Sequence, residues 1–180
     1  PTKFEKNLNL IPKKIITIGK YYIPKIINYD ESINVESGPA FRYDYLWKIK
    51  NKNFTENFKK LNILISLPIL YNDSINIINQ FFKYYNKNYN NELINLIYIK
   101  PHPVDNIDII AYIKKYTNTK VKIVSGKIQD LFLKTNILIS SNSISCVEAI
   151  FLDIPVINIK KKKSLNFSPF PNNIQFNGVF

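Results

Sequence analysis

The single histidine of the chain, His102, lies in the stretch Lys100-Pro101-His102-Pro103. A proline on each side restricts the backbone and limits the directions in which the imidazole can point. An imidazole donates a hydrogen bond to a phosphate oxygen in either protonation state, and Lys100 adds a second cation beside it. The sequence leaves two interpretations open, an anion-binding histidine or a surface histidine in a loop between a strand and a helix.

A second polar group is the run Ser140-Ser141-Asn142-Ser143, which we expect between a strand and the start of a helix. Hydroxyls and backbone N–H groups at a helix start form an anion site that suits phosphate. The alternative is ordinary N-capping, because Ser and Asn are preferred cap residues. Glu148 follows about one and a half turns into that helix. It could contact the hydroxyls of a bound ribose, or it could be a solvated acid in an early helix turn.

Several kinds of site are excluded by composition. With one histidine and one cysteine, Cys146, the chain cannot build an internal disulfide or a His/Cys zinc site, and Cys146 is most simply a small core residue. The sequence has no G-x-G-x-x-G, P-loop or G-x-S-x-G motif, which disfavours dinucleotide, NTPase and hydrolase functions. The net charge of +12 invites a nucleic-acid interpretation, but only Arg42 among 25 basic residues is an arginine. Because base readout favours arginine, we expect no nucleic-acid partner.

Short apolar runs alternate with segments of helical spacing over most of the chain. This alternation predicts a Rossmann-like parallel sheet with helices on both faces. The runs are nearly continuous rather than alternating, as is typical of parallel strands covered on both sides. The expected strands are 61–70, 93–99, 120–124, 136–140 and 156–159, and the expected helices are 72–86, one opening at 105, one around 128–132, and 143–151.

The first fifty residues differ from the rest. Two short strands are expected at 15–18 and 33–35, with a helical segment at 21–28 between them. This stretch is too short to bury a core of its own. We therefore predict that 1–55 is the end of a preceding α/β domain with its linker, and that 56–180 is a second α/β domain with a C-terminal tail.

The order of the motifs resembles a known family of enzymes. The segments I-K-P-H-P and D-L-F-L-K-T-N-I-L-I-S-S-N-S-I-S-C-V-E-A-I-F-L-D-I-P-V-I resemble the donor half of GT-B glycosyltransferases. The likeness is strongest to bacterial sialyl- and polysialyltransferase-like enzymes that carry an H-P and a later S-S motif. The piece E-S-G-P-A-F-R-Y-D-Y-L resembles the crossover that ends the N-terminal domain of such proteins, although Ala40-Phe41 intervenes before Arg42. The resemblance covers roughly residues 33–160.

The resemblance implies roles for particular residues. His102, Ser140 and Ser141 would contact the donor phosphate, Glu148 the donor ribose or sugar, and Pro103 would be the structural proline of the H-P motif. From their positions we add Ser143 to the phosphate site, and Lys100 and Asn142 as supporting residues. The family's catalytic base lies in the N-terminal acceptor domain and is not identifiable here, so the chain is expected to be an incomplete glycosyltransferase. No metal and no cofactor besides the nucleotide-sugar donor are expected.

The implied function is transfer from a nucleotide-activated sugar in the synthesis of bacterial capsule or lipopolysaccharide. A CMP-linked acidic sugar is the first donor to consider, because H-P and S-S occur together. A CDP-glycerol polymerase-like or UDP-sugar-using GT-B enzyme is an alternative, and a noncatalytic basic module that binds nucleic acid or anionic membrane is another. The expected partners are the donor and a glycan or glycolipid acceptor. The expected location is the cytoplasm, with peripheral contact at the inner face of the membrane.

Overall fold

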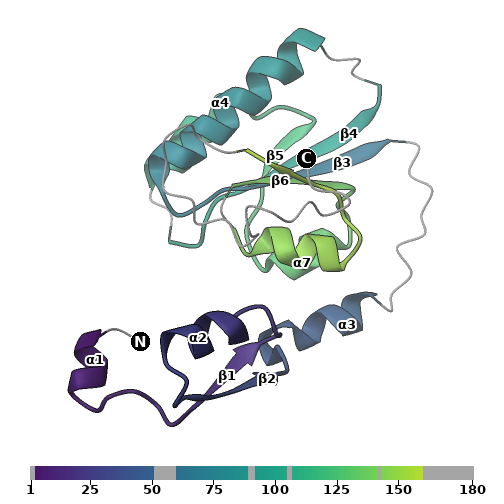
Figure 1. Cartoon of the computed structure of the whole chain (residues 1–180). Coiled ribbons are helices and arrows are strands. Elements are labelled where there is room, and N and C mark those ends of the chain that lie inside the picture. The colour runs from purple at the N-terminus through teal and green to yellow at the C-terminus, as the bar shows by residue number, and fades with distance from the viewer. Residues whose placement is uncertain (1–2, 51–59, 89–91, 105–106, 142, 160–180) are drawn as a thin grey trace. The chain divides into compact units, whose positions relative to one another are not determined.

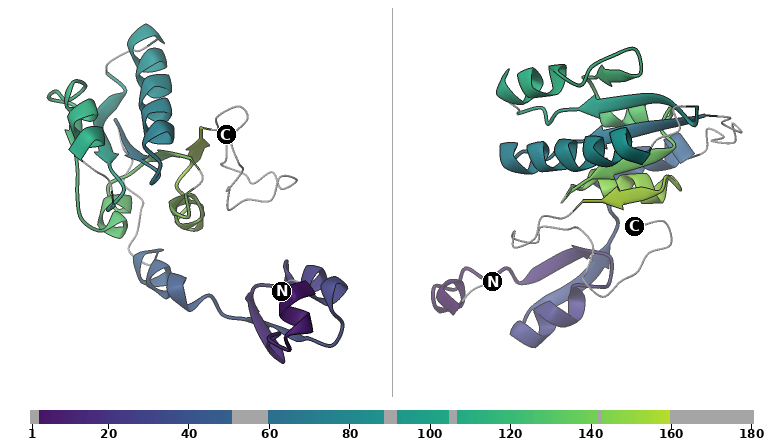
Figure 2. Two further views of the ribbon diagram at one scale, coloured as in Figure 1. Left: turned by 90° about the vertical axis from the view of Figure 1, so that its left-hand side faces the viewer. Right: turned by 90° about the horizontal axis from the view of Figure 1, so that it is seen from above.

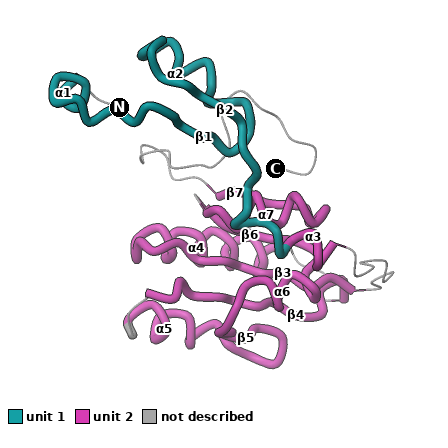
Figure 3. Tube along the Cα trace, turned by 90° about the horizontal axis from the view of Figure 1, so that it is seen from below, with its two compact units in different colours: residues 1–45 teal, residues 46–180 magenta. Residues whose placement is uncertain are grey.

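The computed structural model describes residues 3–50, 60–88, 92–104, 107–141 and 143–159 (Figure 1). The chain forms two compact units, Pro1–Tyr45 and Leu46–Phe180, shown in different colours in Figure 3. The assignment of 1–55 to the end of an acceptor domain, and of 56–180 to a donor domain, remains a prediction. No helix among the described residues is both long enough and apolar enough to cross a bilayer.

Unit 1 contains a small parallel sheet. It runs α1 (Lys3–Asn7), β1 (Lys14–Ile18), α2 (Ile23–Tyr29), β2 (Asn34–Gly38) and the 3₁₀ turn η1 (Phe41–Tyr43). Strands β1 and β2 pair in parallel from Lys14 opposite Asn34 to Ile18 opposite Gly38. Asp30, after α2, pairs with Lys6 at 2.7 Å and accepts hydrogen bonds from Ser32. These contacts, led by the Lys6 hydrogen bond, lower the pKa of Asp30 to about 2.

Unit 2 is a five-stranded, fully parallel sheet with helices on both faces (Figures 1 and 2). The helix α3 (Asp44–Lys50) leads into it. The remaining elements, in chain order, are β3 (Leu61–Ser66), α4 (Tyr71–Asn88), β4 (Ile94–Lys100), α5 (Ile107–Lys114), β5 (Val121–Ile123), α6 (Ile128–Phe132), β6 (Ile137–Ser140), α7 (Ser145–Phe151) and β7 (Val156–Asn158). The predicted fold class, a Rossmann-like α/β sheet, is confirmed. A strand or helix is present at each place predicted in this unit, but β3 ends at Ser66 rather than at 70, and α7 begins at Ser145 rather than at 143. The predicted helix start at 105 lies outside the described residues.

The strand order β5-β4-β3-β6-β7 contains a reversal. The chain moves outward from β3 through β4 to β5, and then returns to place β6 on the other side of β3. In open parallel sheets, ligands bind beyond the carboxyl ends of the strands at such a switch point. The switch in this sheet lies between β3 and β6.

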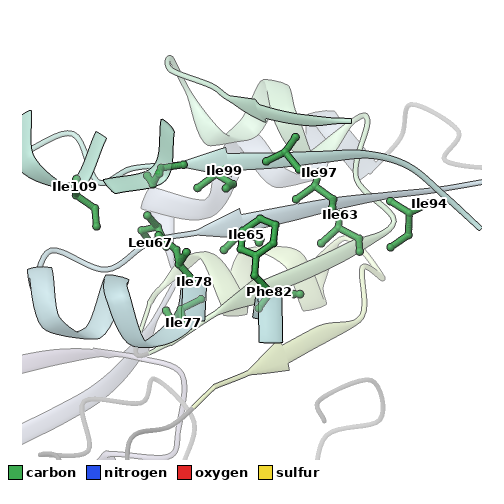
Figure 4. Close-up of a cluster of buried hydrophobic side chains, with 13 residues drawn as sticks. Ile63, Ile65, Leu67, Ile77, Ile78, Phe82, Ile94, Ile97, Ile99 and Ile109 are labelled. Carbon is green, nitrogen blue, oxygen red and sulfur yellow. The ribbon is translucent and has the colours of Figure 1, made fainter. Parts of the chain in front are cut away.

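One face of the sheet is built almost entirely from isoleucine. Ile63 and Ile65 of β3 and Ile97 and Ile99 of β4 are buried in one cluster with residues of α4 and α5, and Figure 4 shows these side chains beside Phe82. Side chains alternate between faces along a strand, so the intervening residues point the other way. Buried Leu64, Leu138 and Val156 therefore belong to the opposite face, on the side of α7.

Candidate functional site

The predicted site residues gather at the carboxyl edge of the sheet, but not at one point. His102 follows the end of β4, whereas Ser140 ends β6, and β3 lies between these two strands. Since neighbouring strands are about 4.8 Å apart, the two strand ends are separated by roughly 10 Å. A ligand that touches both His102 and the serines must extend across the end of β3.

A row of polar residues crosses this edge in register. Ser66 pairs with Lys100, and Ser140 pairs with Asn158, while the pairing of Ile65 with Ile139 places Ser66 beside Ser140. By strand alternation, all four belong to the face on which α7 lies. Ser66, Lys100 and Ser140 are buried, and Oδ1 of Asn158 is buried without a hydrogen-bond partner. Ser66 and Asn158 were not among the residues predicted from the sequence. Each of them is a polar residue at the end of an apolar strand, and this pattern could have indicated a position at the carboxyl edge.

Ser140 has a structural hydrogen bond. Its side chain is fully buried, and its Oγ donates to the carbonyl oxygen of Ser66 at 2.7 Å. This bond joins β6 to β3 at the switch point. Because a hydroxyl has one hydrogen to donate, the Ser140 hydroxyl in this geometry does not donate to a phosphate.

The remaining serines also differ from one another. Ser143 accepts a hydrogen bond from the backbone N–H of Ser145 at 3.3 Å, and the Oγ atoms of the two residues are 2.8 Å apart. The N-cap of α7 is Ile144, which makes no side-chain capping bond, so Ser143 is not a cap but is bonded to the first helical residue. Ser141 is 5% exposed and directly follows the end of β6. Asn142 lies outside the described residues.

His102 is held in a defined orientation. Its Nδ1 accepts a hydrogen bond from the backbone N–H of Val104 at 3.2 Å. A neutral imidazole has one acceptor and one donor nitrogen, so this bond places the proton of the neutral ring on Nε2. The ring is half-buried.

A pocket of about 400 Å³ adjoins His102. This volume is within the range of pockets that bind small molecules. Apolar and polar groups both contribute to the wall of the pocket. Gly126, which also lines it, adopts a positive φ of 90° in the turn after β5. The lining residues are Lys100, Pro101, His102, Pro103, Ile110, Ile123, Val124, Ser125 and Gly126. The pocket is thus formed by the ends of β4 and β5, on the side of His102 away from the serines.

Two residues of α7, Glu148 and Cys146, are buried near this edge of the sheet. Glu148 is buried, being 7% exposed, and lies one turn into the helix. Cys146 is fully buried, and burial raises the pKa of its thiol to about 11. The thiol therefore stays protonated at neutral pH, as expected for a core residue. Within the described residues, no three His, Cys, Asp or Glu side chains gather in a group that could hold a metal ion.

The strand order and register define a doubly wound, Rossmann-like α/β unit. No protein-family model matches the chain. No curated protein matches it either.

Among solved structures, the chain is similar to the wall teichoic acid polymerase TagF, with 16% sequence identity and a TM-score of 0.43. The similarity covers 87% of this chain and 42% of that one. A variant of TagF soaked with CDPG gives 19% identity and a TM-score of 0.42, over 87% of this chain and 40% of that one. The chain thus spans about two fifths of the length of these structures.

Proposed function

We propose that unit 2 binds the nucleotide part of an activated sugar donor, and that the chain is the donor-binding portion of a GT-B glycosyltransferase of bacterial surface-polysaccharide synthesis. The observation that carries the proposal is the pocket of about 400 Å³ at the carboxyl edge, with His102 and Lys100 in its wall. The order of the H-P and S-S motifs supports it independently.

In this proposal the pocket between the ends of β4 and β5 holds the nucleoside, with Ile110, Ile123 and Val124 against the base. Nε2 of His102 donates to a phosphate oxygen, and Ser141 contacts the part of the donor that extends across the end of β3. Negative charge grows on the phosphate as the sugar leaves, so donors fixed beforehand stabilise the transition state more than the ground state. Glu148 is proposed to bind the donor ribose or sugar.

The partners of the reaction follow from the same proposal. The first donor to test is a CMP-linked acidic sugar, with CDP-glycerol and UDP-sugars as the alternatives. The acceptor is a glycan or glycolipid, and the base that deprotonates it belongs to an acceptor domain. Transfer takes place in the cytoplasm at the inner face of the membrane, and no metal is proposed to take part.

Calorimetric titration of the full chain with CMP, CDP and UDP tests the proposal. A charged hydrogen bond contributes about 1.5–3 kcal/mol, so His102→Ala is expected to weaken binding by about tenfold or more. Ser141→Ala is expected to weaken it by a smaller factor. Lys122→Ala, which removes an exposed lysine from β5, is the matched control and should bind as the wild type does.

Equal affinity of wild type, His102→Ala and Ser141→Ala for all three nucleotides would contradict the assignment. The alternative of a basic module predicts binding to generic nucleic acid or anionic vesicles that falls steeply with salt. That result, together with no nucleotide binding, would replace the proposed function with the noncatalytic one.

A further inference from the structure

An apolar groove lies on the isoleucine face of the sheet, at the side of β6 and β7. We call it the α4–β7 groove, and its volume is about 360 Å³. Its wall contains no charged side chain. The lining residues are Ile63, Gln80, Phe81, Tyr84, Tyr85, Ile94, Ile137, Ile139, Ile157 and Ile159.

The exposure of this face is unusual for a parallel sheet. Such sheets are normally covered on both faces, because their strands carry apolar residues on both sides. On this face, however, Ile157 of β7 is 37% exposed and Tyr84 of α4 is 63% exposed. Leaving apolar surface in water costs about 25 cal/mol per Å², so a covering segment would stabilise the fold.

The sequence that follows β7 has the composition of such a cover. Ile159 lines the groove, and the chain continues from it for 21 residues, 160–180, which are outside the described residues. After the four lysines 160–163, the stretch 164–180 contains no charged residue, in a chain that is 21% charged. It holds four of the chain's 12 phenylalanines, at positions 167, 170, 176 and 180, together with Leu165, Ile174 and Val179.

We propose that the α4–β7 groove is the docking site of this chain's own C-terminal stretch, residues 164–180. The uncharged, phenylalanine-rich stretch matches a groove without charged groups. The four intervening lysines span up to about 13 Å when extended, and Ile159 already lies in the groove wall, so reach does not limit the contact. The docking is independent of nucleotide binding, and failure of the proposed function leaves it standing.

Photo-crosslinking in the full chain tests the occupant. Tyr84 is replaced by p-benzoylphenylalanine, and Tyr71, at the other end of α4, is the control position about 20 Å away. Trypsin cuts after Lys163 and then finds no further lysine or arginine, so it releases residues 164–180 as one peptide. We expect that peptide to be crosslinked at Tyr84, with a yield at least fivefold above that at Tyr71.

A mixture of isotopically light and heavy chains distinguishes the occupants. Adducts within one chain support the proposal, whereas adducts between chains show that a second copy fills the groove and overturn it. Absence of the 164–180 adduct also overturns the proposal. If the adduct is absent and the chain binds anionic vesicles, the groove takes a membrane surface instead of the C-terminal stretch. As a second measurement, the double change Phe170→Asp and Phe176→Asp should increase the fluorescence of bound anilinonaphthalene sulfonate several-fold, and an unchanged signal would contradict the docking.

Discussion

The two faces of the five-stranded sheet differ in the polarity of what they bury. Toward α4 and α5, the strands present isoleucines to Ile77, Ile78 and Phe82. The polar side chain buried one turn earlier on α4, Ser74, donates its hydrogen bond to the carbonyl oxygen of Pro68. Toward α7, the last strand residues form the polar row Lys100, Ser66, Ser140 and Asn158.

The difference shows how one sheet serves two purposes. Apolar burial supplies most of the stability of a domain, whereas burying polar groups costs free energy unless they are hydrogen-bonded. The isoleucine face is therefore expected to contribute mainly to stability. The polar row lies at the carboxyl edge, where ligands of such sheets bind, and we infer that it serves binding in addition to the structural hydrogen bond of Ser140.

The isoleucine face should be the most sensitive to truncation. Ile65→Ala removes a fully buried side chain from the middle of β3, and is expected to lower the free energy of unfolding by about 2–5 kcal/mol. Urea denaturation followed by circular dichroism measures the change. Ile69→Ala, at a residue that is 56% exposed, is the matched control and should change little. A loss at Ile65 no larger than at Ile69 would contradict the burial of Ile65 in the isoleucine face.

Ser140 of the polar row and its neighbour Ser141 should separate stability from binding. Ser140→Ala removes the donor to the Ser66 carbonyl, and is expected to cost about 1–3 kcal/mol of unfolding free energy while nucleotide affinity changes little. Ser141→Ala should show the reverse, with weaker nucleotide binding and nearly unchanged stability. Denaturation and calorimetry on both variants make the comparison, and it fails if both serines affect the same quantity.

The start of α7 provides a smaller effect. Ser143→Ala removes the acceptor for the Ser145 N–H, and is expected to cost about 1 kcal/mol of stability. Ser143→Asn keeps an accepting side-chain oxygen and should restore most of the loss. Thermal unfolding of the two variants measures the difference. If Ser143→Asn is as unstable as Ser143→Ala while nucleotide binding falls in both, Ser143 is a ligand contact rather than a structural partner of Ser145.

The contribution of the Cys146 thiol to the free energy of unfolding should depend on pH only in the alkaline range. Burial raises the pKa of its thiol from 9.0 to about 11, so the unfolded chain ionises this group before the folded chain does. The stability contribution is complete below pH 9 and is lost as the pH rises through 11. The difference in unfolding free energy between wild type and Cys146→Ala should therefore decrease above pH 9 and be constant from pH 6 to 8. A difference that changes between pH 6 and 8 would mean that the thiol is not buried as described.

Much of the fold could be predicted from local patterns. The apolar run at Leu61–Ser66 and the helical spacing of Ile78, Phe82 and Tyr85 placed β3 and α4 correctly, because each pattern reflects burial along one element. The positions of His102 and the serines at strand ends were predicted for the same reason. The roles carried over to these residues from the glycosyltransferases remain predictions.

The interactions at the site could not be predicted in the same way. The hydrogen bond from Ser140 to Ser66 joins residues 74 positions apart, and nothing near either serine in the sequence indicates it. The separation of His102 from the serines by β3 depends on strand order. Asn158 enters the polar row only because β7 pairs with β6.

Periodicity and composition within each segment were enough to predict where the strands and helices of unit 2 lie and which loops carry polar groups. Three features became visible only in the folded unit: how the serines divide their hydrogen bonds, which strand ends are neighbours, and where the pocket beside His102 lies. These depend on the register and order of strands far apart in the chain, where one hydroxyl proton goes to whichever acceptor the fold brings within reach.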